Sequence, residues 1–231
     1  MSDGRNLGAA MNEEGPGRSL QEILNPVNLG AAGKYVIYAG GAFTTAAFRI
    51  MGNIGVGRST DELKEAVTDM QAAYEDASSR PTTTDKTFDA AVSFGSKIFD
   101  APGIYKVGGA VNYAANAIIT LVGEVTDMFI FQSGGTFTFG ESVEVVLEGG
   151  LVAENVYWVG TSAAVGPNTH MEGTFLASGA VTIASGVTMN GIILAQGVAA
   201  SVLENLKTTI SSHMRRGYFH SFKKSSILSI K

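Results

Sequence analysis

The sequence predicts a mainly β protein in which short strands form an irregular β-solenoid and one long α-helix packs alongside. Residues 108–200 consist almost entirely of short alternations of apolar and polar residues, broken every few positions by glycine or small polar residues. Such alternation indicates strands whose successive side chains face opposite ways. The expected strands have only about three to five residues and are joined by tight glycine turns. Short strands at this density favour a solenoid over a sandwich.

The composition agrees with a β-rich domain that has a sizeable core. Of the 231 residues, 45% are hydrophobic, 16% are charged and 29 are glycine, which is well suited to tight turns. The chain has no cysteine, so disulfides and thiolate metal sites are excluded. No apolar run approaches the roughly 18 residues of a transmembrane helix. The first thirty residues lack the apolar region of a secretory signal, so we expect a virion or intracellular assembly rather than secretion.

One amphipathic helix is expected over residues 59–80. Ser59 is a suitable N-cap, and Glu62 follows it at the spacing of a capping box. Pro81 ends the helix. Its apolar residues recur at three- and four-residue steps and form one stripe, which comprises Leu63, Ala66, Val67, Met70, Ala73, Tyr74 and Ala77. A single stripe needs a single partner surface, so the helix is expected to lie along the side of the β body.

Residues 34–59 contain two strand candidates and a glycine-rich segment. The strands are expected at 35–38 and 43–50, with the glycine pair 40–41 turning the chain between them. Residues 52–59 have the spacing of a phosphate-binding loop, with Arg58 in place of lysine. A planar guanidinium does not simply replace the lysine point charge, and the chain lacks the strand–helix alternation of a nucleotide-binding domain. We therefore interpret this segment as a glycine turn into the helix.

The chain divides into three parts. Residues 1–28 are expected to form an N-terminal arm, and residues 29–206 form the solenoid with its helix. Within the solenoid, Gly-Thr-Phe occurs at 135 and again at 173, which predicts two coils of about 19 residues. Residues 207–231 form a tail with six basic and no acidic residues, whereas the rest of the chain has ten basic and 21 acidic residues.

The basic tail also carries aromatic residues, and its composition suggests that it has its own partner. Candidate docking residues are Arg215, Arg216, Tyr218, Phe219, Phe222, Lys223 and Lys224. Other protein subunits of an assembly are the expected partners, with no specific nucleic acid and no transmembrane segment.

Residues able to carry catalysis are sparse. His170, His213 and His220 are not spaced as a metal site, and His170 is expected in a solvated turn. The acidic residues are densest at Glu141, Glu144, Glu148 and Glu154. They alternate with apolar residues, which indicates a polar strand face rather than a catalytic pair of carboxylates. Trp158, beside Tyr157, is expected to fill the core. The sequence therefore predicts a non-catalytic protein without a cofactor.

Several separate segments together resemble the microbial ice-binding (antifreeze) protein family. They are residues 28–30, 55–56, 72–77, 99–106, 128–132 and 155–160, in this order. The resemblance covers about residues 28–205. It implies a discontinuous, roughly triangular β-solenoid with one long α-helix alongside. It also implies a flat solenoid face with small, often hydroxylated, outward residues.

Candidate outward residues for such a flat face lie between apolar residues that should point inward. They are Thr136, Thr138, Ser162, Thr182 and Thr188, and the row is interrupted by Ala164, Ala184 and Asn190.

Three functions fit these observations. The first is a structural or interaction component of a larger assembly, such as a virion minor capsid or surface-layer protein, docked through its terminal arms. The absent signal, the two arms and the interrupted threonine row favour it. The alternative is a genuine ice-binding protein that uses the flat Thr/Ser face, and a further alternative is a glycan or surface adhesion module.

Overall fold

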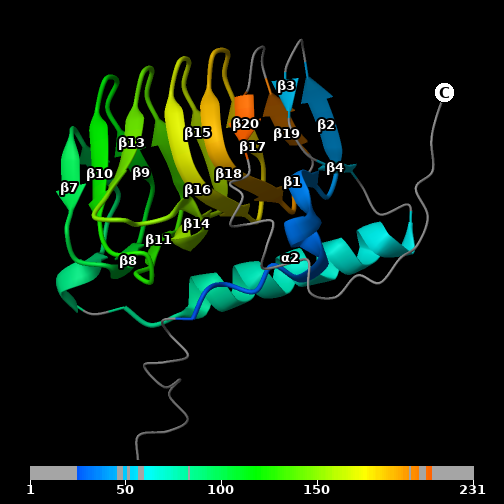
Figure 1. The fold of residues 1–231 in the computed structure, drawn as a ribbon, viewed down its shortest axis with the longest axis horizontal. Coiled ribbons are helices and arrows are strands. Elements are labelled where there is room, and N and C mark those ends of the chain that lie inside the picture. Colours follow the sequence, from blue (N-terminus) through cyan, green and yellow to red (C-terminus); the bar gives the residue numbers. More distant parts are fainter. Residues whose placement is uncertain are drawn as a thin grey trace, which may run out of the picture.

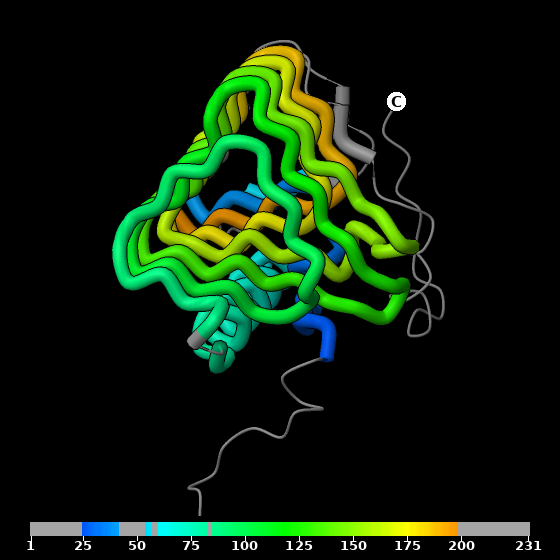
Figure 2. Tube along the Cα trace, turned by 90° about the vertical axis from the view of Figure 1, so that its left-hand side faces the viewer, coloured from blue at the N-terminus to red at the C-terminus, as the bar shows by residue number. Residues whose placement is uncertain are grey.

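The computed structural model describes residues 25–45, 49–50, 53–56, 60–82, 84–197, 199–202 and 207–209. These residues form a β-solenoid that is triangular in cross-section, with one long helix lying parallel to its axis (Figures 1 and 2). The predicted fold class is confirmed. Residues 1–24 and all seven candidate docking residues of the tail lie outside the described residues.

One side of the triangle is the part of the larger sheet, sheet A, that faces the helix. All strand pairs on this side are parallel. Its strands are β5 (Thr87–Phe88), β8 (Gly103–Val107), β11 (Phe129–Ser133), β14 (Val156–Gly160), the second halves of β16 (His170–Ala177) and β18 (Thr188–Ala195), β1 (Tyr35–Ala39) and β4 (Asn53–Val56).

The second side is the remainder of sheet A, which faces away from the helix. Its strands are β7 (Lys97–Phe99), β10 (Ile118–Val122), β13 (Glu144–Glu148), the first halves of β16 and β18, β20 (Lys207–Thr209) and β3 (Arg49–Ile50). The third side is sheet B, formed by β6 (Val92–Phe94), β9 (Val111–Tyr113), β12 (Thr136–Phe139), β15 (Ser162–Val165), β17 (Val181–Ile183), β19 (Ala199–Val202) and β2 (Ala42–Thr45). Short 3₁₀ helices occur at Gly30–Lys34, Thr84–Lys86 and Ala153–Asn155.

The coils differ in length. In sheet B, Phe137 pairs with Val111 and with Ala163, each 26 positions away, whereas Val181 pairs with Ala163 and Ala200, 18 and 19 positions away. The longer coils contain extra connections between the two parts of sheet A. The prediction of two 19-residue coils between 135 and 173 is therefore wrong: Thr136 lies in sheet B, but Thr174 lies in sheet A.

Stacked aromatic rings fill the interior. Trp158 is buried as predicted, and its ring stacks on Phe131 with centroids 4.5 Å apart. The indole Nε1–H donates to the backbone oxygen of Glu172 at 2.9 Å, which satisfies the one polar atom of this side chain. Tyr113 stacks on Phe139 at 5.1 Å. Parallel stacking is possible because residues in register lie above one another in successive coils.

The helix α2 spans Asp61–Ser79 and packs on the outer side of sheet A (Figure 1). Five residues of the predicted stripe are buried, which are Ala66, Val67, Met70, Ala73 and Ala77. They share one apolar cluster with Ile130, Tyr157 and Leu194 of the sheet, so Tyr157 faces the helix and not the solenoid core. The N-cap is Thr60 rather than Ser59, because the Thr60 Oγ1 accepts the Leu63 N–H at 3.2 Å.

Hydrogen bonds from side chains fix both halves of the helix to the solenoid. The Asp69 Oδ2 accepts the backbone N–H of Ala31 at 2.6 Å. At the other end, the Gln132 Nε2 donates to the backbone oxygens of Ala77 at 2.8 Å and Arg80 at 2.9 Å. Pro81, four positions after Ala77, has no N–H to donate, so Gln132 supplies a donor at the C-terminus of the helix.

The N-terminal strands pair with C-terminal ones. β1 lies parallel to β18, β2 to β19 and β3 to β20. The predicted hairpin at 40–41 is therefore wrong: Gly40 is a corner between two sheets, and its N–H donates to the oxygen of Ala195 at 2.9 Å. The single strand predicted at 43–50 is two strands in different sheets. Within the 52–59 segment, β4 is a strand parallel to β1 and is not a loop.

Candidate functional site: the outer face of sheet B

Sheet B presents an outer face of small residues. Along β6, β9, β12, β15 and β17, inward residues are buried or half-buried and apolar, and they alternate with more exposed outward ones. In β17, for example, Val181 and Ile183 are buried on either side of exposed Thr182. This alternation follows from the two-residue period of a strand.

The parallel register aligns the outward residues in rows across the strands. The central row is Ser93, Asn112, Thr138, Ala164 and Thr182. The same register continues to Ser201 and Thr44. Extending the pairing by two positions in either direction gives a row with Ala110, Thr136, Ser162 and Ala180, and another with Ala114, Gly140, Gly166 and Ala184.

The structure brings together four of the five predicted face residues. Thr136, Thr138, Ser162 and Thr182 all lie on the outer side of sheet B. Thr188 does not join them, because it lies in β18 of sheet A and its Oγ1 is 2.7 Å from the His170 Nδ1. Asn190 is in the same strand as Thr188, so it does not interrupt the row either.

Sequence reasoning missed much of this face. Ser93, Asn112 and the alanines of the two rows were not among its candidates. A signal was available in a five-residue pattern, small–apolar–small–apolar–small, which recurs at 91–95, 110–114, 136–140, 162–166 and 180–184. In the sequence, Ala164 looks like an interruption of a threonine row. In the structure it lies between Thr138 and Thr182 in the same row, and its small side chain does not project from the face.

The outer face of sheet B is uncharged and level. None of its five-residue segments contains an acidic or basic residue, and none of their outward positions holds a side chain larger than asparagine. Close stacking of the corners contributes to this regularity: a Cβ on Gly134 would collide with the Gly108 carbonyl oxygen of the coil below. The Thr136 Oγ1 and Ser162 Oγ form a 2.6 Å hydrogen bond across two strands. Such a face offers methyl groups and hydroxyls but no acid–base pair.

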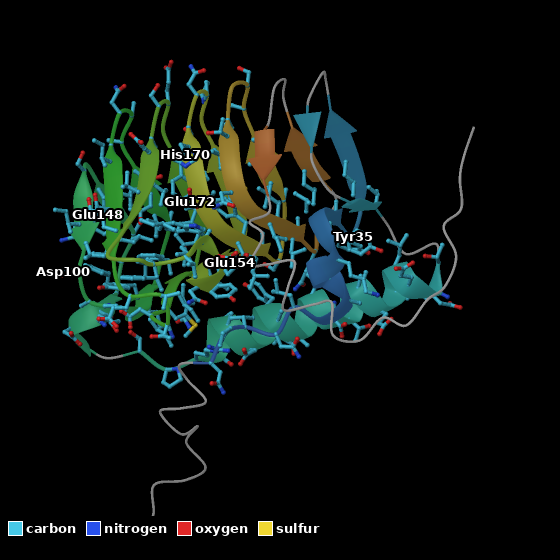
Figure 3. All side chains as sticks on the ribbon, in the orientation of Figure 1. Tyr35, Asp100, Glu148, Glu154, His170 and Glu172 are labelled. Atoms are coloured by element: carbon cyan, nitrogen blue, oxygen red, sulfur yellow. The ribbon has the colours of Figure 1, made fainter. Side chains whose placement is uncertain are left out.

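A second polar cluster lies on sheet A, away from the helix (Figure 3). The His170 Nε2 is 3.0 Å from the Glu172 Oε1, and the Asn190 Nδ2 donates to the Glu172 Oε2 at 2.9 Å. The hydrogen bond to Glu172 raises the pKa of His170, burial lowers it, and the charges of Glu172 and Glu144 raise it further, with a net upward shift. His170 is therefore half-buried in a strand and bonded, and not in the solvated turn that was predicted.

The described residues contain no group of three or more His, Asp or Glu side chains placed to hold a metal ion. Glu144 and Glu148 are exposed on β13, as the alternation predicted. In the part of the chain that the structure describes, no helix has the length and apolarity to cross a membrane.

The triangular solenoid, the helix alongside it and the uncharged outer face of sheet B define the class of this protein as a helix-braced β-solenoid. The family model described as "Ice-binding-like" matches residues 28–206, and the chain belongs to this family. It is 32% identical over 135 residues to an ice-binding protein of Flavobacterium frigoris (strain PS1), covering 58% of this chain and 48% of that protein. It is 33% identical over 163 residues to one of Flammulina populicola, covering 68% and 64%.

The chain thus spans about half to two thirds of the length of these relatives. Among solved structures, an ice-binding protein from an Antarctic biological consortium has a TM-score of 0.74 and 26% identity, covering 86% of this chain and 97% of that one. None of these proteins is named for a catalysed reaction.

The comparisons overturn the first predicted function. The relatives are ice-binding proteins, so the prediction of a virion or surface-layer component docked to other subunits is wrong. That prediction depended on the terminal segments and on the apparent gaps in the threonine row. The terminal segments carry no information about the solenoid faces, and the gaps are alanines that belong to the same level surface.

Proposed function

We propose that this protein binds ice through the outer face of sheet B. The observation that carries the proposal is the register of Thr138 with Ala164 and of Ala164 with Thr182, flanked by Thr136 beside Ser162. This register repeats small outward groups over successive coils. The names of the family and of the relatives point to the same activity.

The geometry suits a crystalline partner. Neighbouring strands lie about 4.7–4.9 Å apart, and alternate residues along one strand about 6.6 Å apart, so the outward groups form a two-dimensional grid. Each water that a protein surface holds in place costs up to about 2 kcal/mol of entropy. Water in ice is already ordered, so a rigid grid that fits it avoids most of this cost. Parallel pairing throughout sheet B and the packed aromatic interior hold the grid in place.

The chemistry of the face also suits ice. Threonine offers a methyl group that water surrounds and a hydroxyl that can donate or accept a hydrogen bond. Charged side chains would hold their own hydration water, but the five-residue segments of sheet B have none. Alanine and glycine at the other positions allow close approach of a flat solid.

Ice growth assays on the purified protein test the proposal. We expect thermal hysteresis and inhibition of ice recrystallisation in the wild-type protein. Changing Thr138→Tyr or Thr182→Tyr should remove most of both activities, because a ring projecting from the central row separates the face from the crystal. A variant with Thr120→Tyr, which places the same ring on an outer position of β10 in sheet A, is the matched control and should retain activity.

Circular dichroism of each variant verifies that the solenoid is intact. The proposal fails if the wild-type protein has no effect on ice growth at high concentration. It also fails if Thr120→Tyr and Thr182→Tyr reduce the activity equally.

A further inference from the structure

The outer side of β7, β10 and β13 exposes apolar residues. Ile98 on β7 is 64% exposed and Ile118 on β10 is 47% exposed, and they are two of the five exposed large hydrophobic side chains among the described residues. The register places Ile98 and Val146 on either side of Thr120, so two apolar positions flank the threonine across three strands. Nothing within the described residues covers them.

Acidic residues border this apolar area. Ile118 is in register with Glu144, and Val122 with Glu148, and both glutamates are exposed. Asp100 directly follows β7, and Figure 3 shows Asp100 and Glu148 on the same part of the solenoid. The strands β7, β10 and β13 contain one basic residue, Lys97, whose Nζ lies 5.9 Å from the Phe99 ring centroid. We call this area, bounded by Ile98, Ile118, Glu144 and Glu148, the acidic–apolar surface.

The C-terminal end of the described chain lies on this same side of the solenoid. The last described strand, β20, pairs with β18, and the order continues through β16 and β13 to β10. Four strand spacings separate β20 from β10, about 19 Å. The 22 residues that follow Thr209 can extend over about 70 Å, so they reach every part of the acidic–apolar surface.

We propose that residues 210–231 of this chain dock on its own acidic–apolar surface. This segment has five basic residues and no acidic one, interspersed with Tyr218, Phe219 and Phe222. The aromatic rings cover the exposed aliphatic side chains, while Arg215, Arg216 and the lysines face the carboxylates of Glu144 and Glu148. Guanidinium groups are well suited to this role, because they pair with carboxylates through two parallel hydrogen bonds.

Covalent linkage favours the chain's own tail over a separate partner. A tethered segment has an effective concentration in the millimolar range at its neighbouring site, so individually weak contacts suffice. Ion pairs at an exposed surface contribute little alone, and here the aliphatic area supplies burial in addition. Docking would leave the outer face of sheet B free, so the inference does not depend on the proposed ice binding.

Distances between two spin labels test the docking in the full chain. Because the natural sequence has no cysteine, labels attach only at introduced positions. One label is placed at Ser221→Cys in the tail and the other at Thr126→Cys, in the exposed connection after β10. The matched control pairs Ser221→Cys with Ser93→Cys, which lies in the neighbouring coil on sheet B. We expect a narrow short-distance population for Thr126 and its absence for Ser93.

Charge and burial are then removed separately. Reversing Glu144→Lys together with Glu148→Lys should abolish the short-distance population, as should Ile98→Asp. The same reversal at Glu65 and Glu75, two exposed residues of α2, should leave it intact. Salt at about 1 M should reduce it, because the screening length falls to about 3 Å.

Two results would overturn the inference. One is equally broad distance distributions for the Thr126 and Ser93 pairs. The other is a short distance that arises only between singly labelled chains mixed together, which would show that the surface binds a second copy.

Discussion

The side-chain oxygens of Thr136 and Ser162 share a 2.6 Å hydrogen bond across β12 and β15. Each of these hydroxyls therefore uses part of its hydrogen-bonding capacity within the protein and holds its neighbour in one rotamer. At this pair, the outer face of sheet B is consequently ordered before it meets any partner.

Replacing Ser162 by alanine should separate the contribution of the hydrogen bond to Thr136 from that of the flat shape of the face. The change removes the hydrogen bond to Thr136 but keeps a small side chain, so we expect a loss of about 0.5–1.5 kcal/mol in the free energy of unfolding. Thermal hysteresis should fall only partly, whereas Ser162→Tyr should abolish it. Ser93→Ala on the same sheet is the control, and it should change neither quantity appreciably. A full loss of hysteresis in Ser162→Ala would show that the hydroxyl, and not the level shape, carries the binding.

Gln132 should be important for the attachment of the helix. Its buried Nε2 bonds to two carbonyls at the end of α2, and replacement by alanine leaves both without that donor. We expect Gln132→Ala to lower the free energy of unfolding by about 2–4 kcal/mol, measured by urea denaturation. Gln71→Ala, at an exposed position of the same helix, should stay within about 0.5 kcal/mol. Equal effects of the two changes would contradict the assigned role.

The glycine corner at 134 should not accept a side chain. A Cβ there meets the backbone oxygen of Gly108, and a carbonyl in a packed coil cannot move aside easily. Gly134→Ala is expected to cost about 1–3 kcal/mol in unfolding free energy. At Gly95 an added Cβ meets nothing within 4 Å, so Gly95→Ala should be neutral or slightly stabilising. Thermal denaturation of both variants provides the comparison.

His170 should make part of the stability depend on pH. Its folded-state pKa is raised above 6.5, mainly by the hydrogen bond to Glu172, and the nearby charge of Glu144 acts in the same direction. A raised pKa means that the stabilisation is fully present below the unfolded value of 6.5 and is lost as pH rises through the folded value. Two uncharged side chains belong to the same cluster: Thr188 is hydrogen-bonded to His170, and Asn190 donates to Glu172.

Urea denaturation of the wild type and of His170→Gln at several pH values checks this sign. The stability advantage of the wild type should be larger at pH values below 6.5 than in mildly alkaline solution. An advantage that grows with pH would show that the imidazole is neutral when paired.

The sequence predicted the helix and the solenoid because both signals are local. The stripe from Ala66 to Ala77 follows the helical period, and the short alternations from 108 onwards follow the strand period. Which side of the solenoid a strand belongs to is not a local property, as Thr182 and Thr188 show. Both lie between apolar residues, yet a corner at Gly186, with a φ of 74°, turns the chain from sheet B to sheet A between them. Alternation alone does not locate such corners.

Partners that are distant in sequence explain the other errors. Gly40 and Gly41 have the local character of a hairpin turn, but β1 and β2 pair with β18 and β19 instead of with each other. The coil lengths of 18, 19 and 26 residues likewise follow from connections that leave no regular repeat. The four correctly grouped residues of sheet B were found because threonine and serine stand out, whereas the alanines of the same rows resemble ordinary core residues.

The pairing of the first strands with the last has a consequence for synthesis on the ribosome. Ile37 emerges early, but its neighbour in β18, Ile193, is made more than 150 residues later. Until then β1 lacks this neighbour, and its edge towards β18 can pair with other strands, including those of other molecules. Contacts this distant in sequence also slow folding, because the intervening chain must be ordered before they form. Closure of this solenoid therefore waits until β18 has been made, so strands late in the sequence hold strands early in it.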